Sequence, residues 1–325
     1  MEIYIVISIE GDKRMRTTIG EMLSRNKAKR NEIPMIILFL APALALYFFL
    51  FINPSIQAFY VSLFDWNGFT SGMKYIGLQN FVELFHDSAF WETAVVNSLK
   101  IIMFGGVIIF SLAFLISGLL STRIKGRKFM RALIFMPSVI NPVAVAILWA
   151  FIYNHKWGLL NNILNVIGLA QWARPWMSPE TLFGAILATL VWMNCGFYCV
   201  ILLAALDKVP DSYLDASKIE GANEFQIFFR IKLPLIKDVL STAVTLWVIE
   251  AVKEFALLFA WGGGVDIPPA GATNMAVKMY ITAFGRRVTV YRMGYATAMG
   301  VIMFLTVGIS VLLINRLFRS DTFEY

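Results

Sequence analysis

Long apolar blocks are the feature that most restricts what this chain can fold into. Blocks of about 20 mostly apolar residues recur along the chain, and a helix of that length spans the hydrocarbon core of a bilayer. Backbone N–H and C=O groups in a bilayer must find partners within their own segment, so each block is expected to be helical. With 58% hydrophobic and 15% charged residues, the chain is too apolar for an ordinary soluble domain. We therefore expect an all-α polytopic membrane protein.

The blocks predict about six transmembrane helices, given about 20 residues for each span. They form one membrane domain over residues 33–319, and its predicted spans cover about residues 33–52, 95–120, 132–153, 182–206, 239–261 and 294–315. The third span contains both Pro137 and Pro142, which predicts a bent or partly broken helix. Such a break either lines a pathway or is a simple packing kink.

Basic residues give the expected orientation, because lysine and arginine accumulate in cytoplasmic loops. Residues 1–32 are polar and basic and should form a cytoplasmic tail, whether the chain starts at Met1 or at an internal methionine such as Met15 or Met22. The basic turn Arg123–Arg131 should also be cytoplasmic, so both termini are expected inside. Residues 272–292, expected to form an external loop, carry several cations against this rule, but late loops orient a chain only weakly.

Motifs for catalysis and metal binding are missing from the sequence. There is no G-x-x-x-x-G-K-[ST] to cradle ATP phosphates and no H-E-x-x-H, so we expect no catalytic residues, no metal site and no cofactor in this chain. The two histidines fall in predicted loops, and Cys195 and Cys199 read as buried free thiols on one helix. The net charge of +7 is spread over span ends and not along a basic stripe, which argues against a nucleic-acid partner.

A polar stretch from Tyr213 to Pro234 interrupts the apolar blocks and lies in a predicted cytoplasmic loop over residues 207–238. Asp211 or Ser212 is expected to cap a first helix, and Gly221 to end it in the left-handed conformation. Asn223 and Gln226 have the spacing of a capping box for a second helix, which Leu233-Pro234 should stop. Phe225, Phe228 and Phe229 could pack beneath the pair. A rigid helix-turn-helix of this kind either docks on a partner or is an ordered loop without one.

This stretch resembles the EAA loop of permease subunits from binding-protein-dependent ABC importers, whose pattern is E-A-A-x-x-x-G followed by I-x-L-P. Asp215 stands in the Glu place, Ala216 and Ser217 in the Ala places, and Gly221 in the Gly place, with a closing Ile231-x-Leu233-Pro234. The resemblance implies that the loop is the coupling helix docked on an ATPase subunit. The coupling residues it implies are Tyr213, Asp215, Ala216, Ser217, Glu220, Gly221, Ala222, Ile231, Leu233 and Pro234.

Other stretches are similar to the maltose-type first permease of sugar importers, namely Asp65–Phe69, Gly77–Phe81, Gly158–Asn161, Gly262–Gly264 and Gly294–Ala296. The resemblance implies the type I permease fold in a bacterial inner membrane. It also implies a second permease as heterodimer partner, two ATP-binding subunits that hold ATP and Mg, and an external substrate-binding protein. Residues 262–274 are a candidate contact for that binding protein.

Charged residues inside the fifth span are candidates for the substrate pathway. Glu250, Lys253 and Glu254 would be costly in lipid and should face protein or water, and Glu250 and Lys253 can also simply pair with each other. Trp192, Asn194 and Trp247 are further candidates, because sugar sites combine aromatic faces with a few polar groups; helix packing is the alternative for each.

Together these features predict the transmembrane subunit of an ATP-driven importer for a carbohydrate, a di- or oligosaccharide that could be neutral or acidic. The alternatives are an ABC permease for a non-sugar solute and a stand-alone secondary transporter or channel. A secondary transporter predicts inverted repeats and ion-coupling acidic residues in several spans, and neither is clear in this sequence.

Overall fold

A computed structural model of the chain describes residues 34–35, 37–121, 125–262, 269–285 and 291–318. By contacts the chain divides into two compact units, Met1–Ala58 and Phe59–Tyr325. The described part of the first unit is helical and includes the π-helical turn η1, Phe48–Ile52. The helix Ile37–Val61, long and apolar enough to span a membrane, ends with α2 (Asn53–Val61).

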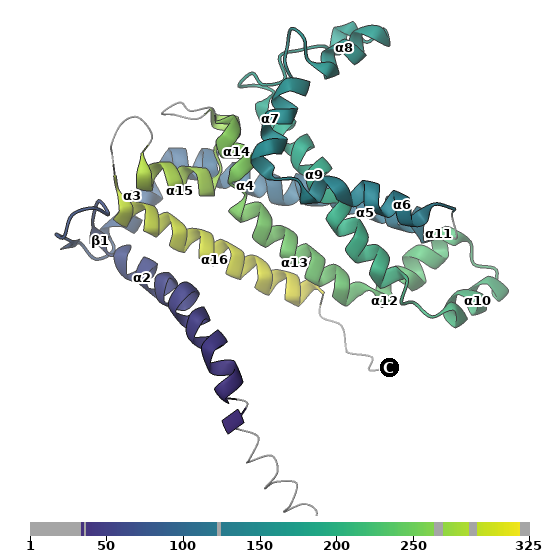
Figure 1. The fold of residues 1–325 in the computed structure, drawn as a ribbon, viewed down its shortest axis with the longest axis horizontal. Coiled ribbons are helices and arrows are strands. Elements are labelled where there is room, and N and C mark those ends of the chain that lie inside the picture. Colours follow the sequence, from purple (N-terminus) through teal and green to yellow (C-terminus); the bar gives the residue numbers. More distant parts are fainter. Residues whose placement is uncertain (1–33, 36, 122–124, 263–268, 286–290, 319–325) are drawn as a thin grey trace, which may run out of the picture. The chain divides into compact units, whose positions relative to one another are not determined.

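The second unit is almost entirely helical (Figure 1). A two-stranded antiparallel sheet pairs β1 (Phe64–Asp65) with β2 (Lys74–Tyr75). The elements that follow, up to the polar stretch, are α3 (Gln79–His86), η2 (Ala89–Val95), α4 (Val96–Lys100), η3 (Ile101–Gly105), α5 (Gly106–Leu120), α6 (Arg127–Phe135), η4 (Met136–Val139), α7 (Pro142–Ile152), α8 (Leu159–Val166), η5 (Ala170–Trp172) and α9 (Leu182–Leu206).

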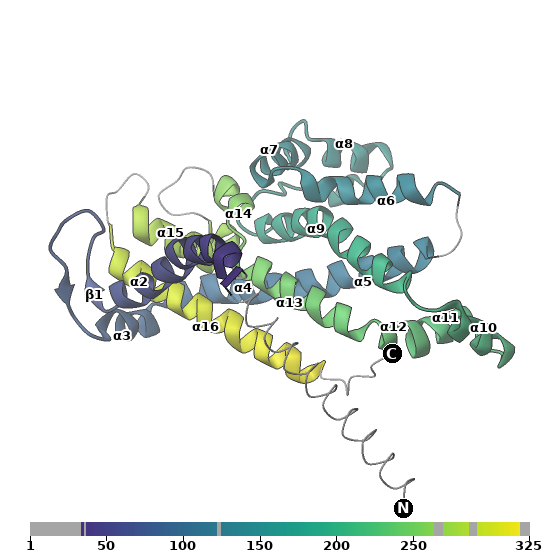
Figure 2. The same ribbon diagram turned by 60° about the horizontal axis from the view of Figure 1, so that its bottom comes forward.

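The polar stretch and the last spans complete the unit. Their elements are α10 (Asp211–Ile219), α11 (Glu224–Ile227), η6 (Phe228–Lys232), α12 (Leu233–Leu235), α13 (Lys237–Lys253), α14 (Ala256–Trp261), η7 (Ala270–Ala272), α15 (Met275–Phe284) and α16 (Met293–Leu317). Helices α5, α9, α13 and α16 form the body of the unit, with α10 and α11 at one end and β1 and α3 at the other (Figures 1 and 2).

Four helices in the described residues are long and apolar enough to cross a membrane, or five if one bent pair counts as a span. They are Ile37–Val61, Ala89–Leu120, Leu182–Leu206 and Met293–Leu317, and the bent pair is Arg127–Val139 with Pro142–Ile152. These helices and the interrupted α13–α14 account for the expected all-α polytopic fold. Residues 1–33, which include all of the expected tail, lie outside the described part of the chain.

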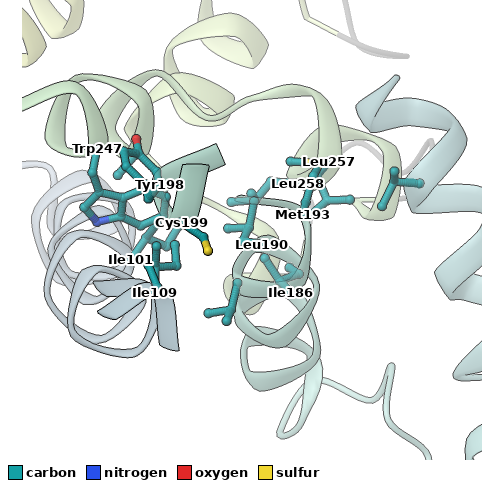
Figure 3. Close-up of a cluster of buried hydrophobic side chains, with 14 of the residues drawn as sticks. Ile101, Ile109, Ile186, Leu190, Met193, Tyr198, Cys199, Trp247, Leu257 and Leu258 are labelled. Atoms are coloured by element: carbon teal, nitrogen blue, oxygen red, sulfur yellow. The ribbon is translucent and has the colours of Figure 1, made fainter. Parts of the chain in front are cut away.

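Helix α9 is the centre of the core, and it packs against elements on several sides. Its contacts run to α5, α6, α13, η3, η4 and η7, and it carries fifteen buried residues over its 25 positions. Tyr198 and Leu190 of α9, together with Ile101 and Trp247, belong to one continuous apolar cluster (Figure 3). A helix that is apolar on nearly all sides is expected where protein surrounds it within a membrane.

The third predicted span is bent by 98° between η4 and α7, as the prolines at 137 and 142 predict. Pro142 lacks the N–H that would continue the helix, and Asn141 caps the restarted helix by accepting a hydrogen bond from the Val143 N–H at 2.8 Å. The two halves therefore run almost at right angles.

Several predicted boundaries are wrong. The first span does not end at Ile52, because the helix continues past Pro54 to Val61. The fifth span is not one helix over residues 239–261, because it breaks between Lys253 and Ala256. Residues 272–292 are not simply a loop, since α15 occupies ten of them. Apolar content locates a span, but caps and tertiary hydrogen bonds decide where each helix stops.

Gly196 allows two helices of the core to approach closely. A Cβ built on Gly196 of α9 would overlap the backbone carbonyl of Ile134 in α6, whereas a Cβ on Gly184 of the same helix would meet nothing within 4 Å. We expect Gly196→Ala to destabilise the protein by about 1–3 kcal/mol through overpacking, and Gly184→Ala to have little effect. Thermal unfolding in detergent measures both, and equal melting temperatures for the two variants would contradict this packing.

Candidate functional site

The polar stretch folds as two short helices joined by a fixed turn. Gly221 has φ +81°, its N–H donates to the Lys218 carbonyl at 3.0 Å, and the Ala222 N–H donates to the Ser217 carbonyl at 3.0 Å. This pair of hydrogen bonds is the Schellman motif, which uses a left-handed glycine to satisfy the last carbonyls of a helix. The predicted role of Gly221 in ending α10 is confirmed.

The second helix begins with the predicted capping box. The Asn223 side chain accepts from the Gln226 N–H, and the Gln226 side chain accepts from the Asn223 N–H, both at 2.9 Å. The predicted cap of α10 is wrong, because Pro210 occupies the N-cap and no side chain caps that end. Asp211 instead lies in the first turn, where its charge favours the positive end of the helix.

Leu233-Pro234 does not end the second helix as predicted. The helical path runs through α11, η6 and α12 and breaks only at Ile236, just before α13. Pro234 lies just after the π-helical turn η6, and it removes one amide donor from this path without ending it.

Most of the expected docking residues are exposed. Tyr213, Asp215, Ala216, Glu220, Gly221 and Pro234 are exposed, Ala222, Ile231 and Leu233 are half-buried, and Ser217 is buried. The Ser217 hydroxyl donates to the Leu214 carbonyl at 2.7 Å, so it stabilises its own helix. Among the aromatic residues, only Phe228 packs on the bundle, with its ring 6.1 Å from that of Phe114.

Phe225 and Phe229 do not pack beneath the helices as expected. Phe225 is 70% exposed, its ring lies 4.4 Å from that of Phe229, and Ile219 of α10 is 88% exposed. An apolar surface of this kind at the tip of a polar loop is typical of a protein interface.

Ion pairs attach the base of the loop to the neighbouring span. Asp207, directly after α9, pairs with both Arg127 and Arg131 of α6. Only Lys208, Val209 and Pro210 lie between Asp207 and α10. Asp207 therefore links the base of the helix pair, α10 and α11, to α6.

The break in the fifth span is stabilised by buried side chains from three segments. The Glu254 carboxylate accepts from the Leu257 N–H at 3.3 Å, which caps the restarted helix α14. The Asn274 side chain donates to the Glu254 carbonyl and accepts from the Val277 N–H, which caps α15. Glu254 and Asn274 are both buried.

Two polar residues at the start of the second predicted span complete this network. The Asn97 side chain donates to the carbonyls of Ala270 and Thr273 at 2.7 and 2.8 Å, and the Ser98 hydroxyl accepts from the Met275 N–H at 3.1 Å. The sequence alone did not single out Asn274. Its only local mark is an Asn immediately before an apolar helix, which is an N-cap pattern.

The two interrupted spans meet at their second halves. Helices α7 and α14 pack against each other, and the Trp261 indole N–H donates to the Ala146 carbonyl at 2.7 Å. The broken helices therefore lie side by side in the same part of the fold.

Five of the six predicted pathway residues fall into two groups. Trp247, Glu250 and Glu254 meet beside the break, together with Ile101, Leu190 and Ala251, and these side chains leave no space for a water molecule between them. Trp192 and Asn194 are used within the bundle, since Trp192 packs edge-on against Trp149 and the Asn194 side chain donates to the Leu190 carbonyl.

Trp247 also has a packing role. It is buried over Gly105 and Gly106, where a Cβ would come within 3 Å of the indole, and its N–H donates to the Ile102 carbonyl at 3.0 Å. Glu250 and Lys253 form the ion pair that their spacing allows, with 3.7 Å between the charged atoms and both side chains more than half exposed. In the described residues, no three His, Cys, Asp or Glu side chains gather as a metal site.

Comparison with known proteins agrees with this geometry. Residues 109–323 match the family described as binding-protein-dependent transport system inner membrane component. The chain is 32% identical to "Probable ABC transporter permease protein YurN" of Bacillus subtilis, over 85% of this chain and 93% of that protein. It is 29% identical to the diacetylchitobiose uptake system permease protein NgcF of Streptomyces coelicolor, over 90% of this chain and 85% of that protein.

Among solved structures, a bacterial ABC transporter involved in the import of the acidic polysaccharide alginate has the same fold. The TM-score is 0.73 at 21% identity, and the match covers 91% of this chain and 98% of that chain. This similarity supports the arrangement of the helices as a type I permease fold.

The capping role of Glu254 can be tested by substitution. Glu254→Ala leaves the buried Leu257 N–H without its partner, and we expect a loss of about 1–3 kcal/mol in the free energy of unfolding. Glu254→Gln keeps an acceptor oxygen and should unfold at or above the wild-type temperature. Glu250→Ala, on the half-exposed pair, should cost at most about 1 kcal/mol. Thermal unfolding measures all three, and a stable Glu254→Ala variant would contradict the cap.

Proposed function

The chain belongs to the family of binding-protein-dependent transport system inner membrane components, and from this we propose that it forms half of the pathway of an importer for a di- or oligosaccharide. It is a multi-pass permease subunit of an ABC transporter. The single observation that supports docking on an ATP-binding subunit is the helix pair Asp211–Ile227. Its turn is rigid, and it presents exposed apolar side chains at one end of the bundle.

We propose that this helix pair docks on an ATP-binding subunit. ATP binding would draw two ATPases together, and a stiff helix pair would pass that movement to the spans as a rigid body. The complete importer would contain a second permease, two ATP-binding subunits and an external substrate-binding protein. ATP and Mg would be held by the ATP-binding subunits.

The proposed orientation has the helix pair and both termini in the cytoplasm. The basic residues Arg127, Lys128 and Arg131 begin α6 at the same end of the fold as the helix pair, as the positive-inside rule requires. The opposite end, with β1 and α3, would then be external, as would residues 262–274. Of that candidate contact for the binding protein, residues 263–268 lie outside the described part of the chain.

The substrate class rests on the relatives. The name of NgcF describes uptake of diacetylchitobiose, a disaccharide. Glu250, 55% exposed, would accept hydrogen bonds from sugar hydroxyls, whereas Trp247 and Glu254 are buried. Lys253, 60% exposed, would add a cation for an acidic saccharide.

A substitution at Gly221 tests the docking of the helix pair. Gly221→Trp places a bulky side chain on the docking surface and forces a left-handed backbone that costs about 1–2 kcal/mol for an L-residue. Gly168→Trp is the matched control, because Gly168 has φ +79° and, like Gly221, no neighbour within 4 Å of a built Cβ.

We expect both variants to reach the membrane at wild-type levels. Only Gly221→Trp should lose ATPase co-purification or ATP-driven uptake. Normal uptake by Gly221→Trp, or an equal loss in both variants, would count against docking at this surface.

A second substitution tests the pathway. Lys253→Met removes an exposed charge at the break of the fifth span, and we expect lower uptake and lower substrate-stimulated ATPase activity with subunit assembly unchanged. Lys156→Met is the control, because Lys156 is also an exposed lysine but lies between α7 and α8, outside the fifth span. Unchanged uptake kinetics for Lys253→Met would remove this residue from the pathway.

A further inference from the structure

Helix α3, Gln79–His86, has three different faces, and only one of them is covered by protein. Asn80 and Leu84 form the buried face. Gln79, Glu83 and His86, at positions i, i+4 and i+7, form an exposed polar face. Leu78, at the N-cap, Val82 and Phe85 repeat the same spacing and form an exposed apolar face.

The buried face is anchored firmly to the end of the fold opposite the helix pair. The Asn80 side chain donates to the carbonyls of Ser62 and Phe64 at 2.8 and 2.9 Å. Arg292, which precedes α16, binds both carboxylate oxygens of Glu83 at 2.6 Å. The hydrogen bond from Arg292 lowers the pKa of Glu83, so this contact stays charged at neutral pH.

The corner after α3 is fixed as well. The Asp87 carboxylate accepts from the Phe90 N–H at 3.0 Å and from the Tyr295 hydroxyl at 3.0 Å, and the Trp91 indole N–H donates to the Leu84 carbonyl at 2.9 Å. Only Asp87 and Ser88 separate α3 from the spanning helix that begins at Ala89. Helix α3 therefore lies at the level where that span enters the membrane.

The apolar face of α3 is open in the described structure. Leu78 is 65% exposed, Val82 56% and Phe85 63%, and Phe85 stacks on Trp91 with 5.8 Å between ring centroids. A helix standing in water would carry polar residues on both of its uncovered faces. One polar and one apolar open face is the pattern of a helix lying at a boundary between water and lipid.

The surface next to this face is mostly apolar. Beyond Trp91, the exposed positions of the spanning helix include Val96, Leu99, Met103 and Val107, with the charged Glu92 and Lys100 near its start. The stripe on α3 thus continues into the open apolar side of a span, and aromatic residues such as Trp91 mark the interface between headgroups and acyl chains.

We propose that α3 is an interfacial helix whose Leu78–Val82–Phe85 face is buried in the lipid of one leaflet while Gln79, Glu83 and His86 face water. Given the proposed orientation of the chain, this is the outer leaflet. The helix would hold the β1–β2 hairpin and the start of α16 at a fixed depth in the membrane (Figures 1 and 2).

Spin labels on the two open faces test this proposal. Val82→Cys carries a label on the apolar face, and Gln79→Cys is the matched control on the polar face of the same helix. Cys195 and Cys199 are buried, so the wild-type chain treated in the same way provides the blank. The full importer, purified with its co-purifying subunits, is placed in nanodiscs of phosphatidylethanolamine and phosphatidylglycerol. The accessibility of each label to oxygen and to a water-soluble nickel chelate is then measured.

The expected result is a label at Val82 that oxygen reaches more readily than nickel, and the reverse order at Gln79. A Val82 label that nickel reaches freely would show that this face stands in water and would overturn the proposal. A Val82 label protected from both reagents would show that another subunit covers it, and would overturn it equally. Sugar uptake by the same labelled importers is measured in parallel in proteoliposomes, so a failure of the proposed function is seen separately.

Discussion

A lipid bilayer offers no water to a broken helix, and this constraint governs the centre of the fold. Two spans are interrupted, between Val139 and Pro142 and between Lys253 and Ala256. Backbone groups freed in a membrane must find partners within the protein. Asn141 supplies one at the first break, and Glu254, with Asn274, supplies them at the second. Polar side chains therefore replace water as hydrogen-bond partners at both breaks.

The broken spans and the helix pair differ in physical character. Helices α7 and α14, which follow the two breaks, pack against each other, and the charged residues Glu250, Lys253 and Glu254 lie at or just before the second break. The helix pair at the end of the bundle has the opposite character, because its turn and caps use local hydrogen bonds to make it stiff. The Asp207 ion pairs connect its base to α6, the first half of a broken span. Movement applied at the helix pair would thus reach a break directly.

Local patterns predicted the features that depend on neighbouring residues. The apolar blocks indicated the class, Gly221 and the Asn223–Gln226 pair indicated the helix turn, and Pro142 indicated the bend. The break at Glu254 has no proline or glycine, and its partner Asn274 lies twenty residues away, so no local pattern reveals it. The exposure of Phe225 was missed for a related reason. Apolar residues in a loop are expected to pack against the protein, and the sequence alone does not show that Phe225 is left exposed. Which residues touch substrate is still a prediction.

The central claim is that separate ATPases drive this chain. The most direct test is sugar uptake into proteoliposomes that contain the co-purified importer, with ATP enclosed and the binding protein added outside. We predict uptake that requires the ATP, the binding protein and this chain together. Uptake by this chain reconstituted alone, without an ATPase and independent of ATP, would contradict the account.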